Sequence, residues 1–125
     1  MKALKLAMFA LLIATLSACG PQQYSPEDCN ELVQKIEKKQ TLTEDDFEDM
    51  IDQMLAAVKY VKHQTDATKG NREKEEKLRH DPEFTQAVGF VIMFDFYLEK
   101  HRLSLSDANR TKLEQTREQL DELQL

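Results

Sequence analysis

Cysteine and histidine are the side chains of this protein that most often act as nucleophiles or metal ligands. The chain of 125 residues contains Cys19 and Cys29, and its three histidines are His63, His80 and His101. The histidines are widely separated, none belongs to a His-Glu-x-x-His arrangement, and no cysteine pair accompanies them. We therefore expect no metal site and no catalytic pairing of a cysteine with a histidine.

Motifs of other enzyme classes are also missing from the sequence. There is no Gly-x-Ser-x-Gly elbow and no glycine-rich phosphate loop. We therefore expect a protein that is not an enzyme and uses no cofactor. An enzyme that acts on the cell wall through carboxylates such as Asp95 remains an alternative, although glycosidase chemistry needs two carboxyl groups facing one cleft.

Carboxylates gather at the start of one predicted helix, where a helix dipole favours negative charge. A calcium-binding loop would need alternating acids, a central glycine and a late glutamate, and this segment lacks that pattern. An acidic face of this kind favours a basic protein partner instead. The residues predicted to bind such a partner are Asp45, Asp46, Glu48, Asp49 and Asp52.

Asp95 is a single carboxylate in an otherwise apolar segment. At about 100° per residue it projects beside Val88, Val91 and Leu98 on the apolar side of a helix. A carboxylate buried there needs a partner or a proton. We expect Asp95 to be a buried polar hub that pairs with a Lys, Arg, His or Tyr from another helix. Exposure by local fraying and a functional carboxylate are the alternatives.

The first residues have the features of a secretory signal. Lys2 and Lys5 provide positive charge, and an apolar stretch then runs from Leu6 to Leu16. This stretch is too short, and wrongly flanked, for a helix that spans a membrane. We therefore expect the segment to direct export and to be removed.

The residues Leu16, Ser17, Ala18 and Cys19 resemble the lipobox of bacterial lipoproteins, in which Leu, a small residue, and Ala or Gly precede Cys. The resemblance implies cleavage after Ala18, a diacylglyceryl thioether on Cys19 and acylation of its new amino group. Each buried methylene contributes about 0.8 kcal/mol, so several acyl chains on one cysteine should anchor the protein to a bilayer. An ordinary cleaved signal with a chance cysteine is the alternative.

The resemblance covers residues 1–19, and we recognise no family in residues 20–125. In such lipoproteins an Asp after the lipidated cysteine tends to retain the protein at the inner membrane, so Gly20 favours the outer membrane, facing the periplasm. We therefore expect a signal peptide at 1–18, the lipidated cysteine and a tether at 19–25, and a single domain at 26–125.

The charge balance excludes one large class of partners. The whole chain has a net charge of −6. Without Lys2 and Lys5, 15 of its 17 basic residues remain against 23 acidic residues, a net charge of −8. Nucleic acid requires a basic surface, so we expect no nucleic-acid partner.

Helix caps and apolar periodicity predict an all-α protein, a small bundle of about four helices. Cys29 falls on an apolar stripe, which predicts a buried thiol; an intermolecular disulfide is the alternative. The segment Pro82–Arg102, which is the most apolar of the predicted helices, is expected to be the central helix of the bundle. The predicted helices are Pro26–Lys39, Glu44–Gln64, Pro82–Arg102 and Asp107–Leu123. The charged segment Arg72–His80 is expected to be a solvated short helix or connector, and an electrostatic docking strip is the alternative.

These features predict an envelope lipoprotein that acts as a non-catalytic protein-interaction module, such as an inhibitor, an immunity-type protector or a complex subunit. The alternative function is a carrier of a small apolar ligand or lipid in the bundle core. The carrier would use a cavity lined by Phe90, Phe94 and Tyr97. These residues belong to an aromatic-rich cluster that is predicted to be core, with a ligand cavity or a docking groove between helices as the alternative. Its members are Phe90, Met93, Phe94, Phe96 and Tyr97.

The predicted anchor has a direct test in the mass of the mature protein. Intact protein isolated from membranes should weigh more than the polypeptide of residues 19–125, by the mass of the acyl groups on Cys19. It should be released from membranes by detergent, because several buried acyl chains hold it there. A mass equal to that of the amino acids alone, or release by washing without detergent, would contradict the anchor.

Overall fold

The computed structural model describes residues 23–123, and this part of the chain is all α-helical, as predicted. The predicted signal peptide, Cys19 and the first residues of the predicted tether lie outside the described residues. No helix between residues 23 and 123 is long and apolar enough to span a bilayer. The helices are α1 (Pro26–Glu37), α2 (Glu44–Thr68), α3 (Arg72–Arg79), α4 (Pro82–Lys100) and α5 (Asp107–Leu123), with a 3₁₀ turn at Arg102–Ser104.

Side-chain hydrogen bonds cap the starts of α1, α2 and α5. The Ser25 hydroxyl accepts a hydrogen bond from the Asp28 backbone N–H at 3.2 Å, at the start of α1. Thr43 and Asp46 form a reciprocal capping box at the start of α2. Ser106 caps α5 through the backbone N–H of Asn109. These interactions satisfy backbone donors that a helix N-terminus would otherwise leave free.

Two predicted helix ends are wrong by a few residues, because backbone conformation and local bonding decide them. The first helix ends before the predicted Lys39, which adopts a left-handed φ of 56°. Helix α2 continues past the predicted Gln64, supported by a hydrogen bond from the Thr65 hydroxyl to the Val61 carbonyl, and the chain turns only at Gly70, whose φ is 82°. Arg72–Arg79 is a short helix with no buried residue.

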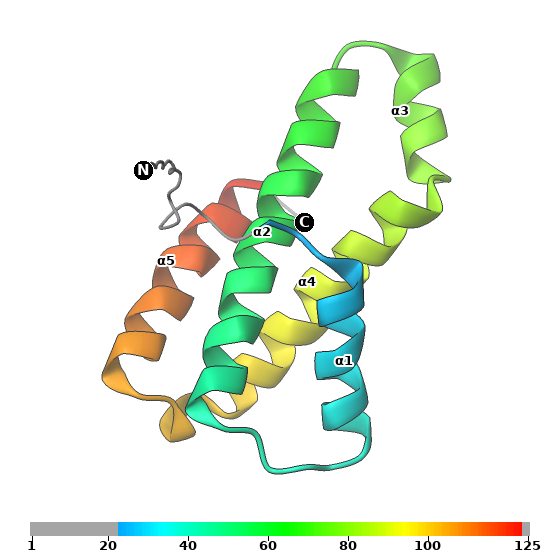
Figure 1. Ribbon diagram of the computed structural model, residues 1–125. Coiled ribbons are helices and arrows are strands. Elements are labelled where there is room, and N and C mark those ends of the chain that lie inside the picture. Colours follow the sequence, from blue (N-terminus) through cyan, green and yellow to red (C-terminus); the bar gives the residue numbers. More distant parts are fainter. Residues whose placement is uncertain (1–22, 124–125) are drawn as a thin grey trace, which may run out of the picture.

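Helix α4 also ends earlier than predicted. Its last residue is Lys100 rather than Arg102, because the chain tightens into the 3₁₀ turn. The prediction that this helix occupies the centre of the bundle is wrong as well. Helix α2 runs through the middle, with α5 on one side and α1 and α4 on the other (Figure 1).

The core is formed around α2 by one continuous apolar cluster. Cys29 is fully buried in it, which confirms the predicted burial of its thiol. Leu42 and Phe47, which flank the capping box, are also buried, as expected for a hydrophobic staple. The largest fully buried side chains include Met50, Ile51, Met54, Phe94, Leu98 and Leu113.

Two leucines near the end of α4 offer a matched test of this core. Leu98 is 0% exposed and Leu103 is 91% exposed. We expect Leu98→Ala to lower the free energy of unfolding by about 2–5 kcal/mol, because it leaves a cavity. Leu103→Ala should change it by less than about 0.5 kcal/mol. Urea denaturation followed by circular dichroism measures both, and equal losses would contradict this core.

Candidate functional site

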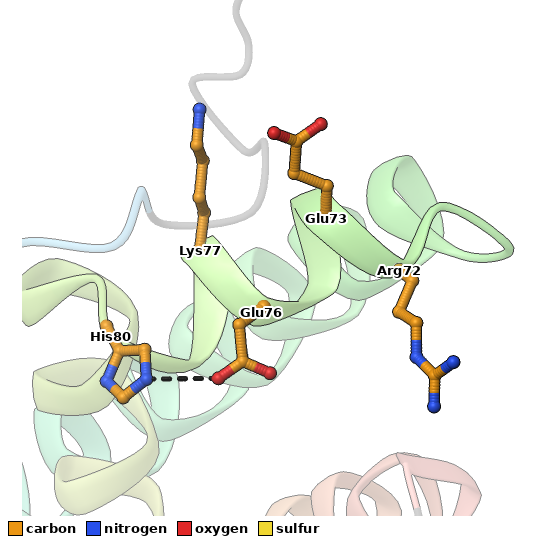
Figure 2. Close-up of a pocket in the computed structure, with 5 residues that line it drawn as sticks. All are labelled: Arg72, Glu73, Glu76, Lys77 and His80. Atoms are coloured by element: carbon orange, nitrogen blue, oxygen red, sulfur yellow. Dashed lines mark hydrogen bonds and ion pairs between the residues drawn. The ribbon is translucent and has the colours of Figure 1, made fainter.

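The side of α3 bounds one open hollow of about 720 Å³. Its lining residues come from α3 and from His80, which directly follows this helix, and their side chains point in different directions (Figure 2). Glu76 and His80 face each other, with 3.2 Å between Oε2 and Nε2, while Glu73 and Lys77 extend the other way. A ligand pocket encloses most of its ligand, and a single short helix does not. The arrangement is that of a solvated helix face.

The five acidic residues predicted to bind a partner do not form one free face. Asp46 lies 2.8 Å from the ammonium nitrogen of Lys35 on α1. The ammonium of Lys112 on α5 lies 3.2 Å from Glu48 and 2.9 Å from Asp52. Three of the five carboxylates therefore hold α1 and α5 against the first half of α2.

Asp45 and Asp49 are the other two predicted residues, and both are exposed. Asp49 lines a narrow groove of about 160 Å³ between α1 and α2, together with Asp28 and Glu31. Partial desolvation, followed by repulsion from neighbouring acids, raises the pKa of Asp49. Residues 23–123 contain no cluster of His, Cys, Asp or Glu suited to a metal ion. Docking of a basic partner here stays a prediction.

Asp95 lies at the edge of the core, with its side chain 23% exposed. The sequence did not identify which residue pairs with Asp95. In the structure the partner is Arg117 on α5, whose Nε lies 3.2 Å from Oδ1 of Asp95. That buried oxygen accepts no hydrogen bond within the described part of the chain, so the contact is an ion pair without hydrogen-bond geometry. Desolvation raises the pKa of Asp95, and the charge of Arg117 offsets this only in part.

A network of charged side chains extends from Asp95 across the gap between α4 and α5. Arg117 also contacts Glu99, and Glu99 pairs with Arg102 at 3.2 Å. Arg102 in turn contacts Glu114 of α5. Both helices pack on α2 but make little direct contact with each other. Long polar side chains therefore bridge a space that apolar packing leaves open.

This space is a groove of about 540 Å³, which we call the α4–α5 groove. Two large apolar side chains beside it are exposed: Ile92 at 59% and Phe96 at 71%. Helix α4 uses its other side, including Phe94 and Leu98, to pack in the core. The groove is lined by Val91, Ile92, Asp95, Phe96, Glu99, Arg117, Leu120 and Asp121.

The aromatic-rich cluster is divided between core and surface. Phe90 and Phe94 are buried and stack on each other with ring centroids 5.8 Å apart, as predicted for core residues. Tyr97 is half-buried and stacks on the His101 ring. Core placement is wrong for Met93 and Phe96, which are exposed because α4 has packing partners on only part of its circumference.

Gln53 is a residue that the sequence analysis missed. Its amide is fully buried, accepts a hydrogen bond from the Ser25 backbone N–H at 2.8 Å and donates one to the Gln23 carbonyl at 3.1 Å. Its position three residues after Met50 on the buried side of α2 was the available signal. Gln53 fixes residues 23–25, the end of the predicted tether, against α2.

The Cys29 thiol contacts the same amide oxygen of Gln53 at 3.6 Å. Burial, with a smaller contribution from the charge of Asp28, raises the pKa of Cys29 to about 12. A thiol that stays protonated and buried is a poor nucleophile and is inaccessible to a second chain. The geometry therefore favours the structural role of Cys29 over an intermolecular disulfide.

No protein-family model, curated protein or solved structure matches this chain.

The pKa values of Asp95 and Asp46 are shifted in opposite directions, so the two carboxylates should contribute differently to the free energy of unfolding. Burial raises the pKa of Asp95, whereas hydrogen bonds from Lys35 and the Thr43 backbone lower the pKa of Asp46. A group whose pKa is raised in the folded protein contributes stability that is lost as the pH rises through that pKa. A group whose pKa is lowered contributes stability that is lost as the pH falls through that pKa. Asp95→Leu should therefore change the unfolding free energy at pH 7 by less than about 1 kcal/mol in either direction.

Asp46→Ala is the comparison, and it should cost about 1 kcal/mol at pH 7, because it removes half of a capping box. Its deficit should be fully present above the ordinary Asp pKa of 3.8 and should shrink as pH falls from there through the lowered pKa of the folded state, where the wild-type carboxylate takes up a proton. Urea titrations from pH 3 to 7 provide the measurement. If Asp95→Leu unfolds the protein, or the Asp46→Ala deficit is independent of pH, the two assignments are wrong.

Proposed function

We propose that this protein is an envelope lipoprotein whose acylated Cys19 holds a non-catalytic interaction module at a bilayer. In this proposal the bilayer is the outer membrane, and the module faces the periplasm. The observation that carries the interaction role is the exposure of Ile92 and Phe96 beside the α4–α5 groove. Large apolar side chains that gather next to a hollow commonly mark a surface that a partner covers. The partner in this proposal is a protein.

The attachment of the N-terminal segment supports the proposed anchoring. Gln53 holds Gln23 and Ser25 against the middle of α2. Only three residues lie between Cys19 and Gln23, and the four residue-to-residue steps of an extended chain reach about 14 Å at most. An acylated Cys19 would keep the point of attachment on α2 within this distance of the bilayer. Partners would then be met close to the membrane surface.

The alternative function, a carrier of an apolar ligand in the bundle core, gains no support from the residues proposed to line its cavity. Phe90 and Phe94 stack against each other among buried side chains. Neither residue lines the α3 hollow, the α1–α2 groove or the α4–α5 groove. The exposed surface of α4 therefore supports an interaction role better than a carrier role.

Site-specific photo-cross-linking in the native cells tests the interaction role. A photoreactive phenylalanine analogue in place of Phe96 should yield a discrete adduct with a protein, because this exposed side chain would lie in the interface. The same analogue in place of Glu73, on the solvated face of α3, should yield none. Gel mobility and mass spectrometry identify the adducts.

A Cys19→Ser variant that carries the photoreactive residue at position 96 serves as the second control. Loss of the anchor should reduce the adduct at least about tenfold if the partner is met at the bilayer, because tethering raises the local concentration. Equal adducts at positions 73 and 96, or adducts with lipid alone, would contradict a protein-interaction module.

A further inference from the structure

The α4–α5 groove has both an apolar floor and a charged rim, and the two together restrict what can occupy it. Val91 and Leu120 are among the residues that line the groove, and the exposed Ile92 and Phe96 project from α4. The groove exists because α4 and α5 both pack on α2 rather than on each other. An occupant therefore has to bring apolar side chains to cover Ile92 and Phe96.

The rim of the groove is acidic. Asp95, Glu99 and Asp121 line it, and Arg117 is the one basic residue among the lining residues. Arg117 is already paired with both Asp95 and Glu99 inside the protein, and Arg102 pairs with Glu99 as well. Asp121 is exposed, and no ion pair of Asp121 is found among the described residues. The uncompensated charge is thus negative, and an occupant with Lys or Arg beside its apolar face would complement it.

The same charges argue against a second copy of this chain as the occupant. In a symmetric dimer each surface patch meets its own counterpart. Glu99 and Asp121 of one copy would then face the acidic rim of the other copy, where like charges oppose association. A protein with a net charge of −6 adds long-range repulsion to this local one.

The secondary structure of the occupant follows from the surface that receives it. Residues 23–123 contain no strand, so no exposed sheet edge exists there for a partner strand to extend. The exposed Ile92 and Phe96 are four residues apart, one helical turn along α4. A groove between two helices with this spacing suits an amphipathic helix that lays its apolar face into it.

We infer that the α4–α5 groove binds an amphipathic helix of a protein partner, with the apolar face of that helix over Ile92 and Phe96 and its Lys or Arg residues beside Asp121. This inference rests on the proposed interaction role and adds the chemistry of the partner. It places recognition on α4 and α5, away from the acidic start of α2 that the sequence indicated.

Designed peptides of about four helical turns provide defined probes. The first has a Leu-rich face flanked by Lys, the second has the same face flanked by Glu, and the third has the composition of the first in scrambled order. Binding to the intact mature protein is measured by fluorescence anisotropy, in nanodiscs of neutral phosphatidylcholine so that Lys does not bind the lipid. Empty nanodiscs give the background.

The basic amphipathic peptide should bind at least about tenfold more tightly than the acidic and scrambled peptides, because it alone matches both floor and rim. Phe96→Ser should weaken its binding about tenfold or more, while Leu103→Ser, a change at another exposed apolar residue, should leave it unchanged. Asp121→Lys should weaken the basic peptide and strengthen the acidic one, and Glu75→Lys on α3 should do neither.

Several outcomes would overturn the inference. These are equal binding of the basic and acidic peptides, binding that Phe96→Ser does not affect, and a Phe96-dependent dimer in analytical ultracentrifugation. If peptide binding fails while photo-cross-linking at position 96 still yields a protein adduct, the partner chemistry is wrong but the interaction role stands. If neither is observed, the interaction role itself is wrong.

Discussion

The fold depends on the shared burial of α2. Four other helices pack on it, and its apolar residues, from Phe47 to Val61, occupy more than one side of the helix. A helix that is covered in this way has to be apolar over a wide arc, which α2 achieves with small and flexible residues such as Met54 and Ala57. Helices α1, α4 and α5 need only one buried side each, and α3 has no buried residue, so each of these helices keeps an outer surface that is free for other uses.

The same arrangement explains where charge is used for structure and where it is left over. The carboxylates at the start of α2 lie within reach of both flanking helices, and three of them pair with Lys35 or Lys112. Farther along, α4 and α5 diverge, and Arg117 spans the gap to Asp95 and Glu99. Arg117 and Arg102 pair with Asp95 and Glu99, and no ion pair of Asp121 is found among the described residues. The exposed apolar surface and the negative charge beside it therefore arise because α4 and α5 both pack on α2 rather than on each other.

The N-terminal segment is joined to this frame by a single buried amide. Gln53 bonds to the backbone of Gln23 and Ser25, and the Tyr24 ring lies 5.3 Å from the Tyr60 ring, centroid to centroid. Because a buried amide is costly unless both of its ends are bonded, this arrangement is specific to one path of the chain. The path leads toward the proposed lipid anchor and sets how closely the helices would approach a bilayer.

The sequence by itself determined that the protein is helical, and it located most helix boundaries to within a few residues. Caps such as Thr43 with Asp46, and the burial of Cys29 on its stripe, depend on interactions within one or two turns of chain. It could not decide that α2 is central, that Phe96 is exposed or that Asp95 pairs with Arg117. These outcomes depend on which helix covers which face, and residues far apart in sequence reach their partners only when the tertiary structure forms.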